Sequence, residues 1–330
     1  MKYSRFPACI ATLILLLWAL SLFASCFFGA CALDSADIVR VFLSSDEAID
    51  QSIRQIVLML RLPRALLAAL CGGSLAVAGV ALQGVLRNPL ADPYTLGISQ
   101  GAACGASLVL IGNLALWIPW AAFAGAMLAT FATLWLGQGQ GRPVAAGVLL
   151  AGIAVSTFFG SLVALIKALN EESVTSIVFW IMGSLQGRSW ESLPIILVCL
   201  IPASLVLALE WRALDVLALG DDQALGMGVS IHWVRIRILL AAGLLTAACV
   251  AVAGVIGFVG LVVPHILRLL FGMRHAVLII AAFFAGGILL LWADVLARTV
   301  LSDGQEVPVG VVTAFIGGPF FAMLLKRKNI

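Results

Sequence analysis

Apolar runs of about 20 residues recur from one end of this 330-residue chain to the other. A helix of that length crosses a bilayer, because it satisfies its own backbone polar groups within the hydrocarbon core. The runs do not alternate polar and apolar residues, as strands of a membrane β-barrel would. We therefore predict an all-α polytopic membrane protein with about ten transmembrane helices, forming one domain over residues 1–330. The expected spans are 8–32, 55–84, 96–113, 115–136, 144–168, 192–210, 235–256, 258–272, 276–297 and 307–325.

The first span could instead be a signal peptide, since Lys2 and Arg5 precede an apolar run that ends in "FASC" or "FGAC". Phe23 and Phe28 fit poorly at the third position before the cysteine in a lipoprotein-type cleavage site. An uncleaved first helix is therefore preferred. The span at 258–272 is short and follows the glycines of "AGVIGFVG", so we expect a broken or re-entrant helix whose backbone is covered by protein or lines a water-filled path.

Basic residues are distributed unevenly between the two sides of the membrane. On the side of the termini, Lys and Arg outnumber Asp and Glu by twelve to five, whereas the opposite side has seven basic and eleven acidic residues. Because positive loops are retained in the cytoplasm, both termini are predicted to be cytoplasmic. The outer loop from Asp34 to Arg54 has room for a short helix.

Metal and redox chemistry have no sequence support here. The seven cysteines include no CxxC pair, and we expect them to be packing residues. The three histidines show no metal-ligand spacing, and we expect them at the membrane interface. No metal, cofactor or nucleic-acid partner is predicted.

The chain also lacks the residues that two common mechanisms of energising transport require. Ion-coupled carriers usually place an ionisable side chain deep in the bilayer, whereas Lys167, Arg268 and Asp294 all fall near span ends. The phosphate-binding motif GxxxxGK[ST] is absent, since the chain contains no Gly-Lys pair. If ATP drives the protein, a separate subunit must hydrolyse it.

An inner loop, "LALGDDQALGMGVS" over 217–230, could receive that subunit. Asp221 and Asp222 suit the start of a short helix, and Gly226 or Gly228 suits its end. So short a helix is marginal alone, and we expect docking on a partner to order it, with Leu219, Leu225 and Met227 available for burial. An ordinary solvated loop with a capped turn is the alternative.

Seven strings, in order along almost the whole chain, resemble the FecCD-type permeases of bacterial ATP-binding-cassette (ABC) importers for iron-siderophores, haem and cobalamin. They are "RLPR" (61–64), "LQGVLRNPLADPYTLGISQGA" (82–102), "WIMGSL" (180–185), the inner loop above, "GFVGLVVPHILR" (257–268), "ADVLAR" (293–298) and "EVPVGVVTAFIGGPFF" (306–321).

The resemblance implies the type II permease fold and an inner-membrane subunit in contact with lipid. The resemblance further implies that the subunit pairs as a homodimer or with a second permease, binds two ABC ATPase subunits and receives substrate from a periplasmic binding protein. It also implies coupling helices at about 213–228, where the ATPase contact consists of Leu219, Gly220, Asp221, Asp222, Gln223, Ala224, Leu225 and Gly226.

Three outer arginines, Arg61, Arg64 and Arg298, match family positions that receive carboxylates of the binding protein, a role that suits the planar guanidinium. Two structural alternatives stay open. Arg61 and Arg64 could anchor a helix start around Pro63, and Arg298 could pair with Asp294 at i, i+4 spacing.

One departure concerns the inner loop "GQGQGRPVAAG", where cobalamin-type relatives place hydroxyl residues at a cytoplasmic gate and this chain offers Ala145 and Ala146. Substrate identity is therefore not carried over. Ferric siderophore is favoured as the commonest cargo of the family, with haem and cobalamin as alternatives. Two other functions remain, a stand-alone secondary transporter or channel and a membrane subunit without transport of its own.

Overall fold

The structure, a computed structural model, describes residues 8–29, 31–43, 50–139, 142–143, 145–272, 274–301 and 304–327. Helices dominate, and β1 (Gln138–Gly139) and β2 (Arg142–Pro143) pair antiparallel in one short turn. The α-helices are α1 (Ala8–Ser25), α2 (Ser35–Leu43), α3 (Gln51–Gln55), α4 (Leu62–Val85), α5 (Ile98–Ile111), α6 (Ile118–Leu136), α7 (Ala145–Leu169), α8 (Val174–Ile181), α9 (Leu193–Leu217), α10 (Asp221–Gly226), α11 (Ile231–Ala253), α12 (Val259–Phe271), α13 (His275–Thr299) and α14 (Val309–Arg327).

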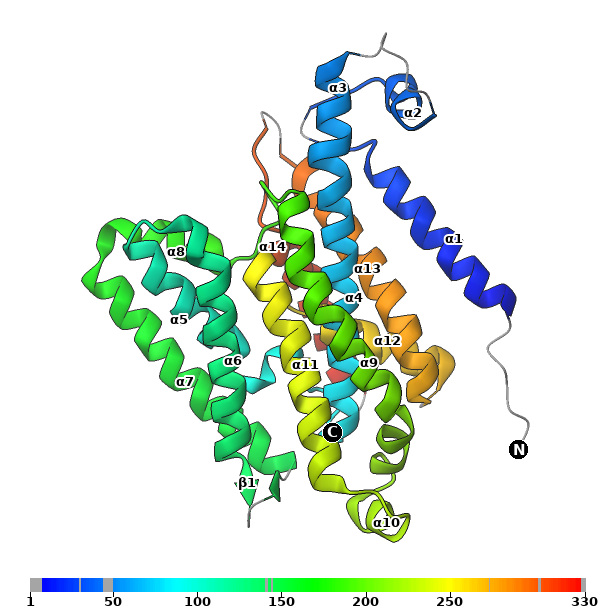
Figure 1. Cartoon of the computed structure of the whole chain (residues 1–330), viewed down its shortest axis with the longest axis vertical. Helices are drawn as coiled ribbons and strands as arrows, with labels where there is room; N and C mark the ends of the chain where they lie inside the picture. The colour runs from blue at the N-terminus through cyan, green and yellow to red at the C-terminus, as the bar shows by residue number, and fades with distance from the viewer. Residues whose placement is uncertain are drawn as a thin grey trace.

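The helices lie side by side, with α4 through the middle of the bundle, α5 to α8 grouped on one side and α1 on the other (Figure 1). Within the described residues, six helices are long and apolar enough to span a membrane, and four shorter apolar helices lie at the other expected positions. The predicted all-α fold and its ten spans are confirmed at this level. Helix α8 was not predicted, and α9 extends seven residues beyond the expected end at 210.

Helix α4 continues directly from α3 through a π-helical turn over Ile56–Arg61. Pro63 has no backbone N–H, and the wider turn accommodates it, as the bond from the Leu62 N–H to the Val57 carbonyl shows. The suggested helix start around Pro63 is therefore wrong, because the helix already begins at Gln51.

Close backbone contacts pack the long helices around α4. A Cβ atom on Gly72 would lie 2.2 Å from the Gly286 carbonyl oxygen of α13, and one on Gly79 would lie 1.9 Å from the Gly260 carbonyl oxygen of α12. Small residues allow such approach in membranes, where the hydrophobic effect does not drive helices together.

The predicted broken helix is confirmed. Helix α11 ends at Ala253 and α12 begins at Val259, and Gly254 and Phe258 both adopt positive φ between them. The Tyr94 hydroxyl accepts a hydrogen bond from the Ile256 N–H (2.9 Å) and donates one to the Ile256 carbonyl (3.0 Å). Protein contacts therefore satisfy this stretch of non-helical backbone.

Candidate functional site

The inner loop forms a short helix at one end of the molecule. Helix α10 begins at Asp221 and ends at Gly226, as the acidic pair and the glycine predict, and Gly228 has φ +79°. Figure 1 places α10 at the tip opposite α2 and α3. We call Leu219 to Met227 the coupling segment.

Helix α10 is tied to two of the long helices by its first residue. Asp221 accepts hydrogen bonds from the Arg235 guanidinium of α11 at 2.8 and 2.9 Å. Arg87, just beyond α4, lies 3.8 Å from the same carboxylate. Ala224, in the middle of α10, is fully buried on the inner side of the helix. Arg235 and Ala224 therefore help to hold this segment within the chain, and its further ordering by a docked partner stays a prediction.

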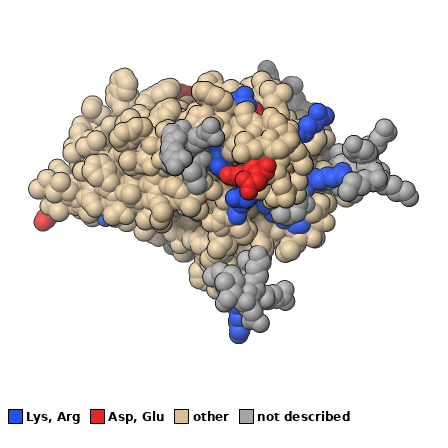
Figure 2. All heavy atoms as spheres, turned by 90° about the horizontal axis from the view of Figure 1, so that it is seen from below, with Lys and Arg blue, Asp and Glu red and all other residues tan. Residues whose placement is uncertain are grey.

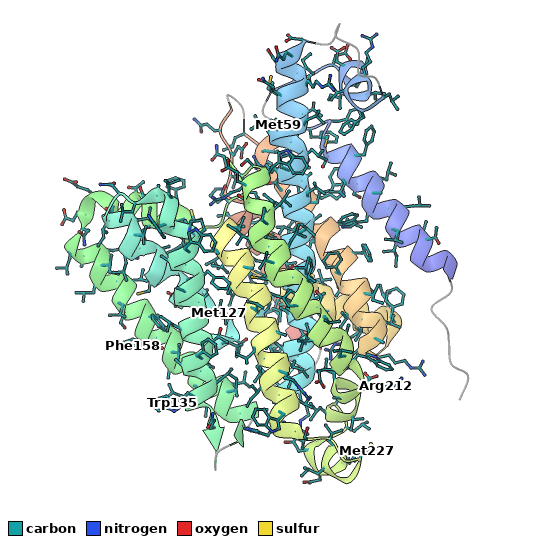
Figure 3. All side chains as sticks on the ribbon, viewed as in Figure 1. Met59, Met127, Trp135, Phe158, Arg212 and Met227 are labelled. Carbon is teal, nitrogen blue, oxygen red and sulfur yellow. The ribbon has the colours of Figure 1, made fainter. Side chains whose placement is uncertain are left out.

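The coupling segment presents apolar side chains outward. Leu219, Leu225 and Met227 are 58%, 55% and 61% exposed. Met227 lies at the tip of the molecule, with Arg212 on the helix above it (Figure 3). Seen from this end, the surface has a compact acidic patch bordered by basic side chains (Figure 2). Charged groups and exposed apolar side chains together are typical of an interface.

A second link at the same end was missed from the sequence. The Asp215 carboxylate of α9 lies 2.7 Å from Nδ1 of His275 and accepts a bond from the His275 backbone N–H at 2.9 Å. The His275 side chain is fully buried within the chain, and its position at the membrane interface stays a prediction. Sixty residues separate the partners in sequence, and no local pattern predicts the pair.

The three outer arginines lie together at the opposite end. Arg61 is 4% exposed and donates to the carbonyls of Cys26 and Cys31, which follow α1. Arg298 is 3% exposed and donates to the Ser25 carbonyl at 3.1 Å. Both guanidinium groups thus hold the end of α1 against α4 and α13.

Arg64 makes the strongest pairs of the cluster. Its guanidinium binds Asp294 at 2.8 to 3.1 Å and Glu306 at 2.8 and 3.0 Å, joining α4, α13 and the segment before α14. The alternative of an Arg298–Asp294 pair is also present, at 3.5 Å. A fourth arginine, Arg188, lines the same outer hollow of about 380 Å³ with Arg61, Arg64 and Arg298.

The structure brings the three arginines together but leaves little of them exposed. A binding-protein carboxylate would reach Arg61 or Arg298 only after movement of the surrounding residues, since both are more than nine-tenths buried. Their direct contact with a binding protein stays a prediction.

The predicted gate residues lie where the short β1–β2 turn meets α7. Ala145 is the first residue of α7 and is half-buried, and Ala146 is exposed. Their end of α7 is the end of the molecule that also carries α10 (Figure 1). Their gating role also stays a prediction.

Known proteins share this architecture and sequence. The profile of the FecCD transport family matches residues 14–327. The cobalamin import system permease BtuC of Halobacterium salinarum is 38% identical over 86% of this chain and 76% of its own length. The hemin transport system permease HmuU of Yersinia pestis is 38% identical over 90% of this chain and 92% of its own.

A solved structure, described as an inward-facing conformation of a putative metal-chelate type ABC transporter, superimposes with a TM-score of 0.84 at 31% identity, covering 97% of this chain and 99% of that one. The match spans the whole bundle and not one motif. Sequence and fold together show that the chain belongs to the FecCD transport family and is a multi-span, inner-membrane permease subunit of a bacterial ABC importer, a transport component that works with ATPase and substrate-binding partners.

Proposed function

We propose that the coupling segment seats in an ABC ATPase subunit and carries the motion of that subunit to α9 and α11. The main support is the combination of exposed apolar side chains on a segment that Asp221 ties rigidly to α11. Leu219 and Leu225 supply the contact, and the pair with Arg235 transmits force. Two ATPase subunits then serve two permease subunits.

Replacing both Leu225 and Met227 by Asp tests this role. The variant should fold and insert but no longer co-purify with the ATPase or import substrate with ATP. Ser230→Asp is the matched control, since it adds a charge nearby at the cap of α11, where Asp is also favoured. Retained co-purification by the double variant, or uptake by the lone chain driven by an ion gradient, would contradict the proposal.

We place both termini and the coupling segment in the cytoplasm. The excess of Lys and Arg on that side supports this orientation. In a variant whose seven native cysteines are replaced by Ser, a cysteine introduced at Ser230 or at Arg54 is labelled in intact cells with a membrane-impermeant reagent, which should modify only the second.

We assign the outer hollow to the periplasmic binding protein, whose carboxylates would meet Arg61, Arg64 and Arg298. Four arginines around this hollow outnumber the two acids, Asp294 and Glu306, that pair with Arg64, and the remaining positive charge would speed encounter with an acidic surface. Arg61→Gln should weaken docking and leave ATPase assembly intact, whereas Arg64 is kept because its removal would leave the buried Asp294 without its main partner. Arg54→Glu, on the exposed part of the same long helix, is the control.

The subunit is proposed to pair with a second permease, as a homodimer or heterodimer. Large apolar side chains on α7 and α14, such as Phe158 (61% exposed) and Phe315 (82%), have no cover within the described residues and are available to a second permease. Cysteines placed at these two positions should cross-link one permease subunit to the other and yield a covalent dimer.

The proposed cargo is a bulky metal chelate, with a ferric siderophore first and haem or cobalamin as alternatives. A cobalamin and a hemin permease are equally similar, at 38%, so overall identity does not select between them. Uptake of radiolabelled ferric siderophore, haem and cobalamin by the assembled importer decides the cargo.

A further inference from the structure

An apolar groove of about 680 Å³ runs between the first turns of α6 and α9, with α8 at its base. Its walls include Pro119, Phe123, Ile195 and Val198, and Trp120 at its edge is 58% exposed. The coupling segment does not use it, and Arg188 lines both this groove and the outer hollow.

The groove has the depth of one membrane leaflet. The lining of each wall runs eight residues inward, from Ala115 to Phe123 and from Glu191 to Cys199. At 1.5 Å per residue this is about 12 Å, a little less than half of the ~30 Å hydrocarbon core. Both helices are among those long and apolar enough to span a membrane, which places the groove at bilayer depth. Trp120, in the lining near the start of α6, is a side chain of the type that favours the headgroup region.

Charged side chains of both signs stand at its outer end. Arg188 lines the groove, and no described residue accepts a hydrogen bond from its guanidinium, whose Nε is buried. Burial lowers the pKa of Arg188, so an anion beside it would offset a desolvation cost. Trp180 likewise has a buried Nε1–H without an acceptor among the described residues. Glu191, also in the lining, is exposed.

We propose that this groove binds one phospholipid of the adjacent leaflet, with an acyl chain against α6 and α9, its phosphate at Arg188 and the ammonium of a phosphatidylethanolamine headgroup at Glu191. The apolar walls match the acyl chain. Arg188 suits a phosphate because its planar fork donates two hydrogen bonds at once. The acid one turn away explains why a zwitterionic headgroup fits better than an anionic one.

Native mass spectrometry of the full chain, extracted with equal phosphatidylethanolamine and phosphatidylglycerol, tests the site. The unmodified chain should retain one phospholipid and prefer phosphatidylethanolamine. Arg188→Gln should reduce retention of both lipids by about tenfold. Glu191→Gln should keep retention but remove the preference. Arg212→Gln, which alters an exposed arginine near the coupling segment, should behave like the unmodified chain.

Val198→Trp gives a second route if Arg188→Gln fails to fold, because it fills the groove without touching a charge. It should release the lipid. Unchanged retention by Arg188→Gln or Val198→Trp, no retained lipid in the unmodified chain, or a co-purified polypeptide in place of lipid would overturn the proposal. ATP-driven uptake by the assembled importer is scored separately, so the outcome does not depend on the proposed coupling role.

Discussion

The carboxylate of Asp221, at the start of α10, accepts two hydrogen bonds from Arg235, one turn into α11. The two residues therefore close the loop that carries the coupling segment, and movement of α10 must move α11. The Asp221 side chain is 35% exposed and that of Arg235 only 4%, so solvent weakens the pair but does not abolish it.

Asp221→Asn should loosen the coupling segment. Loss of the charge is expected to cost about 1 kcal/mol after allowance for solvent, which raises local opening about fivefold. Hydrogen exchange of the amides over 219–228 measures this directly, and ATP-driven uptake should fall with it. Asp222→Asn removes the same charge from a neighbour that is exposed and should change neither. Equal effects of the two variants would count against the pair.

Arg87→Gly should stabilise the end of α4 although it removes an ion pair. Arg87 has φ +49°, a conformation that costs a non-glycine residue about 1 kcal/mol and that glycine adopts freely. Its contact with Asp221, at 3.8 Å and with a 44% exposed side chain, contributes less. Thermal unfolding should rank Arg87→Gly above Arg87→Ala, which loses the pair and keeps the strain. An Arg87→Gly variant less stable than the unmodified chain would show that the lost pair outweighs the relieved strain.

Arg64→Gln should destabilise the folded protein by about 3 kcal/mol, because Asp294 is 1% exposed and would keep a buried charge without its main partner. Adding Asp294→Asn should restore part of the loss. The thermal midpoint of the detergent-solubilised chain measures both effects. Arg54→Gln, at an exposed position of α3, should leave the midpoint unchanged. If the double variant is no more stable than the single one, the internal pair is not the main role of Arg64.

Gly84→Ala should displace His275. A Cβ atom at Gly84 would lie 2.6 Å from Nε2 of His275 and 3.1 Å from Cδ2 of Leu214. Overpacking of this kind costs about 1–3 kcal/mol. The same substitution in a His275→Ala background should cost much less, since the nearest obstacle is gone. A double-mutant cycle on the unfolding free energy tests the coupling, and simple additivity would refute it.

The sequence predicts features that depend on neighbouring residues. The spans follow from run length, and the start and end of α10 follow from "DD" and the glycines. The pair of Arg298 and Asp294, one helical turn apart, was foreseeable as an alternative. Helix α8 was missed because its eight residues, "VTSIVFWI", are too few to span a bilayer.

Long-range pairs lie beyond this reasoning. Arg64 pairs with Asp294 and Glu306, which lie 230 and 242 residues away in sequence. The sequence around Arg64 does not distinguish an arginine with internal partners from one that binds a partner protein. The same holds for the capture of Asp221 by Arg235, which depends on where α11 packs. The sequence of the short acidic loop predicts only marginal helix stability, because the contacts that stabilise the helix come from residues elsewhere in the bundle.

Tyr94→Phe should weaken the break between α11 and α12. The hydroxyl serves both the N–H and the carbonyl of Ile256, and its removal leaves two backbone groups short of a partner in a stretch that cannot form helix bonds. The expected cost is about 2 kcal/mol or more in unfolding free energy, with faster amide exchange over 254–258. Thr133→Val is the control, since it removes one hydrogen bond, to the Leu96 carbonyl, and should cost about 1 kcal/mol without effect on the break. Equal exchange over 254–258 in the two variants would mean that packing of Gly254 and Phe258, and not the tyrosine, holds the break in place.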